Sequence, residues 1–321
     1  MSQSQSSLKL SILDLSKTPN PSSLSSLLEA CKEWGFFQII NHGISEELYS
    51  NLCSFSRQIF SLPSDTKLKL GPTSSVKSYT PRFIASPYYE GLRVLGPDFF
   101  SSAECSGKIL FNQKSNEFSE VVQEYGVIMT NLSRRIIEVI LMSLGDGFEK
   151  KFYETEFRKC YGYLRIINYT QPGPTQEEVE GLGKHTDMCC MTILYPDDVS
   201  SLQVRSKEGK WMDIEPVKGS IVLNIGDMLE AWSNGILRSS EHRVMLRKPR
   251  DRLSMAFFWT FEDDKVIFAP KELVGGGPQK KRVFKPFVCS DYVRFREFDD
   301  KEKYDKVGNS VRDFAGIGAE M

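Results

Sequence analysis

The stretch GLGKHTDMCCMTILY, residues 181–195, joins a polar segment with His185 and Asp187 to an apolar run typical of a buried strand. Similar short runs, rich in β-branched and aromatic residues, recur on both sides of it and are separated by turn-forming residues. They are YGYLRIINY (161–169), SLQVR (201–205), KWMDI (210–214), GSIVLNI (219–225), HRVML (242–246) and RLSMAFFWTF (252–261). Many short strands at this spacing predict a sandwich, a barrel or a double-sheet jelly roll.

The N-terminal half has a different pattern. Apolar residues at three- and four-residue spacing predict helices over 21–35, 45–63 and 122–139, and a short buried strand is expected over 36–43. Residues 64–115 are rich in turn-forming residues and are expected to be irregular. The tail after residue 290 is expected to be helical, with Tyr292, Phe295 and Phe298 on one face. The sequence therefore predicts an α+β protein whose helical first half supports an all-β core.

Composition excludes some classes of partner. The chain has 321 residues, a formal net charge of −1 and 40% hydrophobic residues, so neither nucleic acid nor a membrane is expected as a partner. The seven cysteines are scattered and match no disulfide framework or paired zinc motif, which favours a reducing compartment. With no secretory or transit pattern at the start, we expect a cytoplasmic protein, and we expect a monomer that acts on a small molecule.

The three histidines of the chain are His42, His185 and His242. In extended chain, His185 and Asp187 point to the same face about 6–7 Å apart, which suits two ligands of one metal ion. His242 begins another strand of the β half, and a jelly roll can bring it to the same place. Two imidazoles and one carboxylate form the facial triad of non-haem Fe(II) oxygenases, although zinc accepts the same ligands.

A second pair of residues predicts an anion site. Arg252 and Ser254 alternate on a strand that is otherwise Met, Ala, Phe and Trp. A guanidinium in an apolar barrel is costly unless it meets an anion, and it can bind a carboxylate through two hydrogen bonds. An internal salt bridge is the competing interpretation of this arginine.

Together these residues resemble the plant-type 2-oxoglutarate- and Fe(II)-dependent dioxygenases, the superfamily that also includes isopenicillin N synthase. The motifs that carry the resemblance occur in the family's order from residue 8 to about 300. They are WGFFQIINHGI (34–44), FSLPSDTK (60–67), HTD (185–187), GSIVLNIGDMLEAWSNG (219–235), EHRV (241–244) and RLSMAFF (252–258). The style of these motifs is nearest to the gibberellin- and auxin-oxidising members.

The resemblance implies a double-stranded β-helix (jelly-roll) core with iron bound by His185, Asp187 and His242. It implies that Arg252 and Ser254 bind the distal carboxylate of 2-oxoglutarate, that Asn168 assists, and that His42 belongs to a structural turn. Thr170 stands where the family often has a second tyrosine that holds the cosubstrate.

The domain organisation expected from the resemblance has four parts. They are an N-terminal region (8–115), a long supporting helix (116–157), the jelly-roll core (158–265) and a C-terminal extension (266–321).

The implied activity consumes O2, converts 2-oxoglutarate to succinate and CO2, uses ascorbate as reductant, and hydroxylates or oxidises a small, largely apolar plant metabolite such as a gibberellin or auxin. Three alternatives remain open from the sequence. They are an isopenicillin N synthase-type oxidase that does not use 2-oxoglutarate, a non-catalytic binding protein on the same fold, and a zinc hydrolase.

Overall fold

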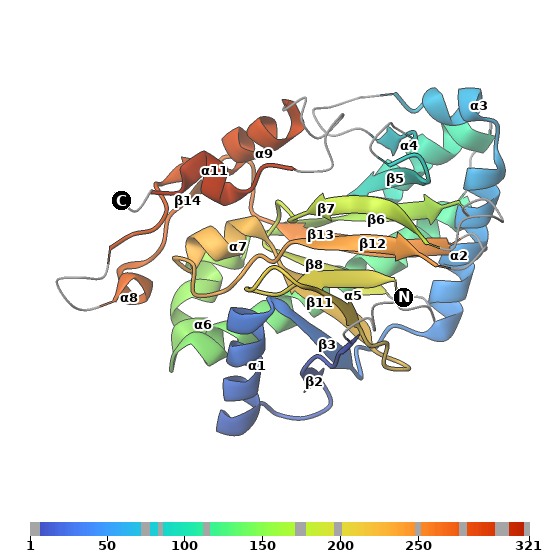
Figure 1. Ribbon diagram of the computed structural model, residues 1–321. Coiled ribbons are helices and arrows are strands. Elements are labelled where there is room, and N and C mark those ends of the chain that lie inside the picture. The colour runs from blue at the N-terminus through green and yellow to red at the C-terminus, as the bar shows by residue number, and fades with distance from the viewer. Residues whose placement is uncertain are drawn as a thin grey trace.

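The computed structural model describes residues 7–71, 78–82, 86–111, 116–170, 178–195, 201–247, 252–275, 281–298 and 308–317. Two β-sheets face each other, with helices along the outer side of the larger sheet (Figure 1). This is the expected α+β jelly roll.

The larger sheet has eight strands in the order β2-β3-β11-β8-β13-β6-β5-β4. Their bounds are β2 Ile12–Asp14, β3 Phe36–Ile40, β11 Ile221–Ile225, β8 Met191–Tyr195, β13 Arg252–Thr260, β6 Tyr161–Tyr169, β5 Tyr89–Leu95 and β4 Tyr79–Thr80. The smaller sheet has the order β1-β10-β9-β12-β7. Its strands are β1 Ser7–Leu8, β10 Trp211–Ile214, β9 Leu202–Arg205, β12 His242–Leu246 and β7 Val179–His185.

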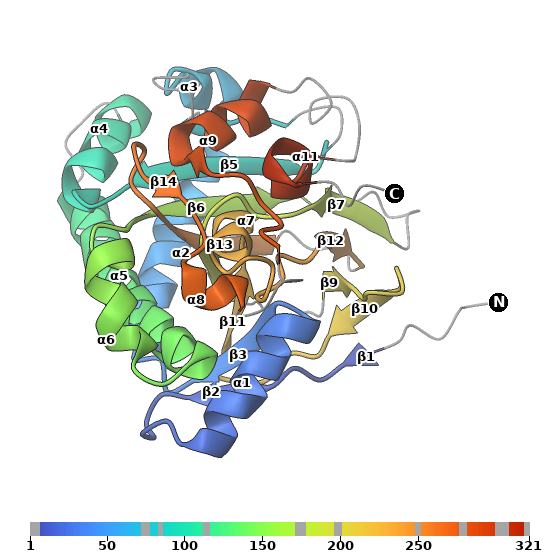
Figure 2. The same ribbon diagram turned by 90° about the vertical axis from the view of Figure 1, so that its left-hand side faces the viewer.

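The helices flank these sheets, and a two-stranded sheet, β14 Val266–Ile267 with β15 Phe287–Val288, precedes the C-terminal helices. Figure 2 shows α4, α5 and α6 along one side, and α9 packs against α11 and β15. The helices are α1 Pro21–Glu33, α2 Glu46–Ser61, α3 Ser64–Leu68, α4 Phe99–Phe111, α5 Asn116–Leu144, α6 Phe148–Phe152, the π-helix η1 Tyr153–Phe157, α7 Asp227–Trp232, α8 Lys271–Val274, α9 Cys289–Phe298 and α11 Val311–Ala315.

Strand alternation divides the apolar residues between two cores. Phe257 on β13 is fully buried in the larger core between the eight-stranded sheet and the helices. Its neighbour Phe258 points the other way, into the smaller core between the two sheets, as alternation along this strand predicts. The space between the two sheets therefore contains the side chains that share the face of Phe258.

The predicted helices and strands are confirmed, apart from one region. Ser45 caps α2 by accepting a hydrogen bond from the amide of Leu48, and α5 covers the predicted 122–139. The expectation that 64–115 is irregular is wrong, because this region contains α3, β4, β5 and α4. Strand β5 pairs along its whole length with β6, and this tertiary pairing decides its structure.

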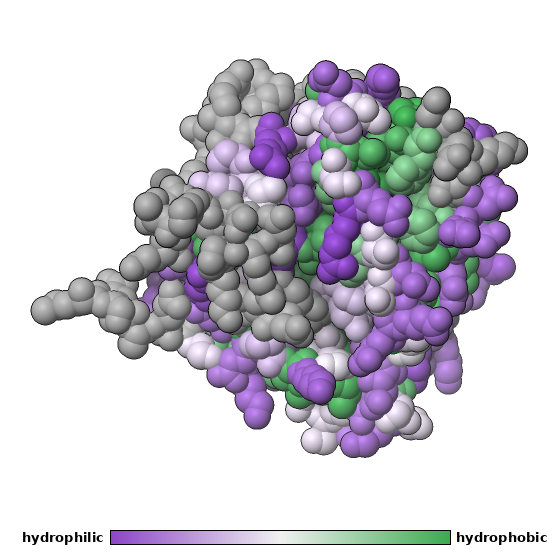
Figure 3. Space-filling model, turned by 90° about the vertical axis from the view of Figure 1, so that its right-hand side faces the viewer, coloured by the Kyte–Doolittle hydropathy of each residue, from purple (hydrophilic) through white to green (hydrophobic). Residues whose placement is uncertain are grey.

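The surface is mixed in polarity. The face in Figure 3 has hydrophilic residues over much of its rim and hydrophobic residues gathered toward its upper part. Within the described residues, no helix combines the length and the apolar character that crossing a membrane requires.

Candidate metal centre

The two histidines of the predicted triad are directly opposite each other on paired strands. His185 is the last residue of β7, His242 is the first residue of β12, and the antiparallel register pairs them. Their ring centroids are 4.2 Å apart. The chain therefore brings together two residues that are far apart in sequence through the pairing of β7 with β12.

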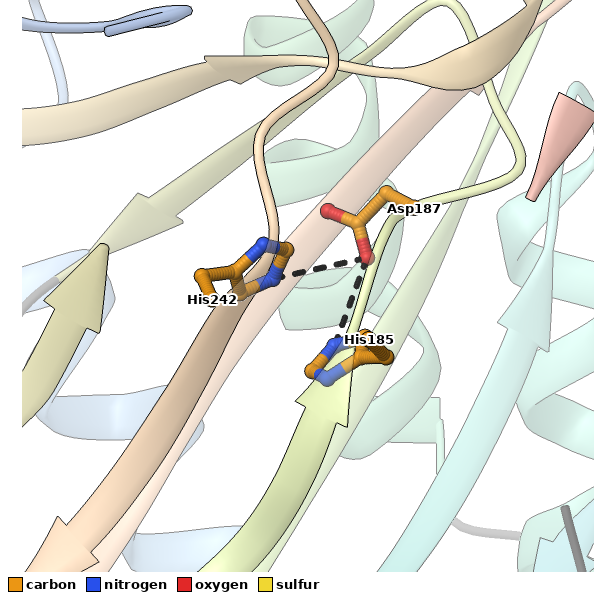
Figure 4. Close-up of side chains that lie close together, drawn as sticks. All are labelled: His185, Asp187 and His242. Carbon is orange, nitrogen blue, oxygen red and sulfur yellow. Dashed lines mark ion pairs between the residues drawn. The ribbon is translucent and has the colours of Figure 1, made fainter. Parts of the chain in front are cut away.

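Asp187 completes the cluster (Figure 4). Its Oδ1 lies 3.6 Å from Nε2 of His185 and 3.8 Å from Nε2 of His242, and the three ligand atoms lie within 4.8 Å of one another. Among the described residues, His185, Asp187 and His242 are the one set of His, Cys, Asp or Glu side chains close enough together to hold a metal ion. His42 lies elsewhere, against the ring of Tyr195.

The groups around the triad fix which atoms face the common point. Nδ1 of His185 contacts the carbonyl of Gly183 at 2.8 Å, and Nδ1 of His242 contacts that of Ser240 at 3.1 Å. A carbonyl can only accept, so each Nδ1 carries the proton and each Nε2 presents a lone pair.

The carboxylate of Asp187 is oriented in the same way. Its Oδ2 accepts hydrogen bonds from Thr192 Oγ1 at 2.5 Å and from Asn224 Nδ2 at 2.7 Å, which leaves Oδ1 toward the histidines. Burial opposes ionisation, but the two imidazoles and these hydrogen bonds outweigh it and lower the pKa of Asp187. Burial, reinforced by His242, lowers the pKa of His185 to about 4. An ionised carboxylate and neutral imidazoles are the states that bind a divalent cation, so the donor set fits Fe(II).

The adjacent cysteines are not metal ligands. Cys189 and Cys190 are buried, and burial raises the pKa of both thiols well above the usual value. Both therefore stay protonated and pack as small apolar side chains, as expected.

A buried polar cluster, which sequence reasoning missed, holds the loop between His185 and Asp187. Thr186 donates to Oδ2 of Asp227 at 2.9 Å, and Arg296 on α9 bonds both the carbonyl of Thr186 (3.1 Å) and Oδ2 of Asp227 (3.0 Å). Tyr292 donates to the same carboxylate oxygen. We call Thr186, Asp227, Tyr292 and Arg296 the clamp cluster.

Backbone contacts tie the clamp cluster to the ligand loop. Gly226, the residue before α7, lies very close to the loop that carries Asp187. A Cβ at this position would lie 2.2 Å from the carbonyl oxygen of Cys189 and 3.0 Å from that of Asp187. Only glycine permits this approach without a shift of the backbone.

A cavity of about 790 Å³ adjoins the clamp cluster. Its wall includes His185, Thr186, Asp227, Glu230 and residues 308–313.

The predicted anion site lies on the inner face of β13. Arg252 and Ser254 are 6% and 2% exposed, and β6 places Tyr169 and Ile167 opposite them. The guanidinium carbon of Arg252 lies 5.2 Å from the ring centroid of Tyr169. A buried guanidinium, a hydroxyl and an aromatic ring thus share one face.

The structure does not bring Asn168 to this face. Asn168 pairs with Leu253 and Glu90 on the opposite face of the sheet, where its Nδ2 donates to Oε1 of Glu90 at 3.1 Å. Thr170 bonds the backbone carbonyl of Tyr88 through its amide at 2.9 Å. The tyrosine beside Arg252 is therefore Tyr169. It lies one position before Thr170, the residue that the family resemblance placed where a cosubstrate-holding tyrosine often stands. Alternation along 161–169 separates Asn168 from Tyr169, but it does not say which of them faces inward.

Comparisons with known proteins agree with this geometry. Residues 161–260 match the model of the 2OG-Fe(II) oxygenase superfamily, and residues 10–89 match the N-terminal domain described as "non-haem dioxygenase in morphine synthesis". A gibberellin 20-oxidase-like protein of Arabidopsis thaliana is 50% identical, with 97% of this chain and 98% of that protein covered.

Two solved structures have similar folds. The dioxygenase for auxin oxidation in rice superposes with a TM-score of 0.75 at 26% identity, covering 89% of this chain and 94% of that one. JOX2 in complex with 2OG, Fe and JA gives a TM-score of 0.75 at 28% identity, covering 91% and 86%.

Proposed function

The chain belongs to the 2OG-Fe(II) oxygenase superfamily and is an Fe(II)- and 2-oxoglutarate-dependent dioxygenase, and on that premise we propose its site residues and its substrate. His185, Asp187 and His242 bind Fe(II), and Arg252 and Ser254 bind the distal carboxylate of 2-oxoglutarate. The observation that carries this proposal is the convergence of two Nε2 atoms and one carboxylate oxygen within 4.8 Å.

Bound Fe(II) and 2-oxoglutarate supply the oxidising chemistry, in which O2 is consumed, succinate and CO2 are released and a C–H bond of the substrate is oxidised. The chain's own residues position the reactants. Arg252 and Ser254 fix the cosubstrate at one end, while Thr192 and Asn224 hold the aspartate ligand in one orientation. The apolar side chains between the sheets exclude water from the oxidising site.

The substrate is a small, largely apolar plant metabolite, and a hormone acid such as a gibberellin or auxin is the proposed class. The names of the similar proteins, a gibberellin 20-oxidase-like protein and an auxin-oxidising dioxygenase, support this class. The ring of Phe258 on the inner face of β13 offers an apolar wall of the kind such a substrate needs. We further propose that the protein is a monomer. We also propose that it acts in the cytoplasm, because all seven cysteines are free thiols and a reducing compartment keeps them so.

The test is an assay of the purified protein with Fe(II), 2-oxoglutarate, O2 and ascorbate against a panel of plant hormone acids. We expect one succinate for each product molecule that has gained an oxygen atom. Asp187→Ala should form neither, whereas the control Glu154→Ala, at an exposed carboxylate that forms an ion pair with Arg158, should retain both. Substrate-dependent O2 uptake without succinate would instead indicate an isopenicillin N synthase-type oxidase. Full turnover by Asp187→Ala would reject the triad.

A further inference from the structure

Two arginines lie opposite each other on the inner face of the larger sheet. Arg93 on β5 is the register partner of Arg165 on β6. Arg165 is four residues from Tyr169 on β6, and Arg93 is four residues from Tyr89 on β5, so each arginine points to the same face of the sheet as its tyrosine. Both tyrosines lie in the core between the two sheets. Both guanidinium groups therefore belong to the face that carries Arg252 and Ser254.

Neither arginine has a carboxylate partner among the residues that the structure describes. Arg93 is 8% exposed, its Nε has no hydrogen-bond partner, and its guanidinium carbon lies 4.0 Å from the ring centroid of Tyr163. Arg165 donates to the neutral hydroxyl of Tyr89 at 3.2 Å. Burial and the charge of Arg165 lower the pKa of Arg93 and outweigh Tyr163, Tyr161 and Glu297, which raise it.

This arrangement is costly for a folded protein. Like charges directly opposite in a strand pair destabilise the sheet. The buried guanidinium of Arg93 loses its hydration without an anion to compensate, whereas Tyr89, Tyr163 and the charge of Asp187 outweigh burial and raise the pKa of the half-buried Arg165. By contrast, the buried Arg296 is neutralised by Asp227 at 3.0 Å. An anion that arrives from outside the chain would neutralise Arg93 and Arg165.

The strand register places Arg93 and Arg165 close to the metal centre, two residues along their strands from the residues that are level with Thr192. Thr192, which holds the carboxylate of Asp187, is the partner of Phe258, and Phe258 is the partner of Tyr163. Arg165 follows Tyr163 by two residues, a step of about 6–7 Å along the strand. The rings of Phe258 and Tyr163 stack at 4.9 Å with an interplanar angle of 7°. An apolar wall therefore leads from the arginine pair toward the metal ligands.

We propose that Arg93 and Arg165 form the receptor for the carboxylate of the substrate, whose apolar body lies along Phe258 and Tyr163 toward the iron. The substrate is then an apolar molecule with a free carboxylate, and its esters and other neutral derivatives are excluded. This inference rests on the proposed function, because it takes the triad as the metal centre and Arg252 as the cosubstrate site.

The test measures binding rather than turnover. The protein is loaded with Fe(II) and 2-oxoglutarate without oxygen, and calorimetry follows three apolar acids of different shape, indole-3-acetate, jasmonate and gibberellin A12. Each acid is compared with its fully methylated ester, which is the dimethyl ester for the dicarboxylic gibberellin A12. We expect at least one acid to bind about tenfold or more tighter than its ester. Arg165→Met and Arg93→Met should each weaken that acid about 30-fold or more, as expected for removal of one partner of a buried ion pair.

A matched control separates this role from a general effect of removing an arginine. Arg243 also stacks on an aromatic ring, Trp211 at 4.3 Å, but it is paired with Glu180 and with Gln203. Arg243→Met should leave the binding of the acid unchanged. Thermal unfolding of each variant shows that it is folded.

Three results would overturn the receptor. They are esters that bind as well as their acids throughout the panel, acid binding that survives both Met substitutions, and a loss confined to 2-oxoglutarate binding. Binding of 2-oxoglutarate to the Fe(II)-loaded wild-type protein, measured by calorimetry without oxygen and without any acid, tests the proposed function separately. Its absence would reject that function, whereas its presence with a failed binding test rejects the receptor alone.

Discussion

The backbone amide of Asp227 donates a hydrogen bond to the carbonyl oxygen of Asp187 at 2.8 Å, so that helix α7 begins directly against the loop with the metal ligand. The side-chain carboxylate of Asp227 accepts hydrogen bonds from Thr186, Tyr292 and Arg296. Through these contacts the C-terminal helix α9 holds the position of a loop about 110 residues earlier in the chain. The clamp cluster therefore links the C-terminal segment to the geometry of the metal centre.

Arg296→Met should lower the affinity of the triad for metal about 10–100-fold, because contacts that orient ligands have effects of this size. It should also reduce the free energy of unfolding by about 3–5 kcal/mol, since it leaves the carboxylate of Asp227 buried without its cation. Titration of the metal-free protein with Co(II), together with urea unfolding, measures both. Arg294→Met, on the exposed side of the same helix, should change neither. An unchanged Co(II) affinity in Arg296→Met would show that the clamp cluster does not position the ligands.

Arg252→Met should raise the KM for 2-oxoglutarate about 30-fold or more, because it removes the buried cation for the distal carboxylate. Tyr169→Leu should raise this KM in the same direction, since its ring lies beside the guanidinium. Thr170→Val should have a smaller effect, because the backbone amide keeps its hydrogen bond to the carbonyl of Tyr88 (2.9 Å) and only the longer bond from Oγ1 to the same carbonyl (3.4 Å) is lost. Succinate formation at varied 2-oxoglutarate measures all three. A larger effect of Thr170→Val than of Tyr169→Leu would contradict the placement of Tyr169 at the cosubstrate site.

Glu90 should make the stability of the protein depend on pH. Burial opposes its ionisation, but hydrogen bonds from Lys67 (2.7 Å), Tyr79 (2.6 Å) and Asn168 outweigh it and lower the pKa of Glu90. The stabilisation is therefore complete above the unfolded-state pKa of about 4.3 and is lost as the pH falls through the lower folded-state value.

Glu90→Gln tests this expectation. At pH 7 it should reduce the free energy of unfolding by about 3–5 kcal/mol, because Lys67 is left buried without its anion. The difference from wild type should narrow below about pH 4, where the wild-type carboxylate also loses its charge. Urea unfolding across this range measures the effect, with Glu154→Gln as an exposed control. A difference that stays constant down to pH 3 would show that the charge of Glu90 is not what stabilises the fold.

The sequence predicted the parts of this protein that depend on local pattern. His185 and Asp187 are two residues apart, and Arg252 and Ser254 alternate on one strand, so each pair could be placed on one face before any fold was known. The strands after residue 160 followed from their own apolar runs. Strand β5 did not, because its sequence has few strand-forming signals and its conformation depends on pairing with β6.

What the sequence could not provide was the inner face of each strand. Asn168 and Tyr169 are neighbours, and only the register of β6 with β13 shows that Tyr169 lies beside Arg252. Arg93 and Arg165 are separated by a long stretch of chain, and nothing in either segment indicates that they are partners. Arg296 lies in a helix whose apolar face was predicted, but its contact with Thr186 depends on how that helix packs. An arginine in a mostly apolar run, such as Arg165 in YGYLRIINY, was the one signal that could have been followed further.

The most direct test of the account is iron-edge anomalous diffraction from crystals grown without oxygen in the presence of Fe(II) and 2-oxoglutarate. We predict one iron peak that contacts Nε2 of His185, Oδ1 of Asp187 and Nε2 of His242, with the keto acid extending from it to the guanidinium of Arg252. An iron peak elsewhere in the chain, or a keto acid whose distal carboxylate lies away from Arg252, would contradict it.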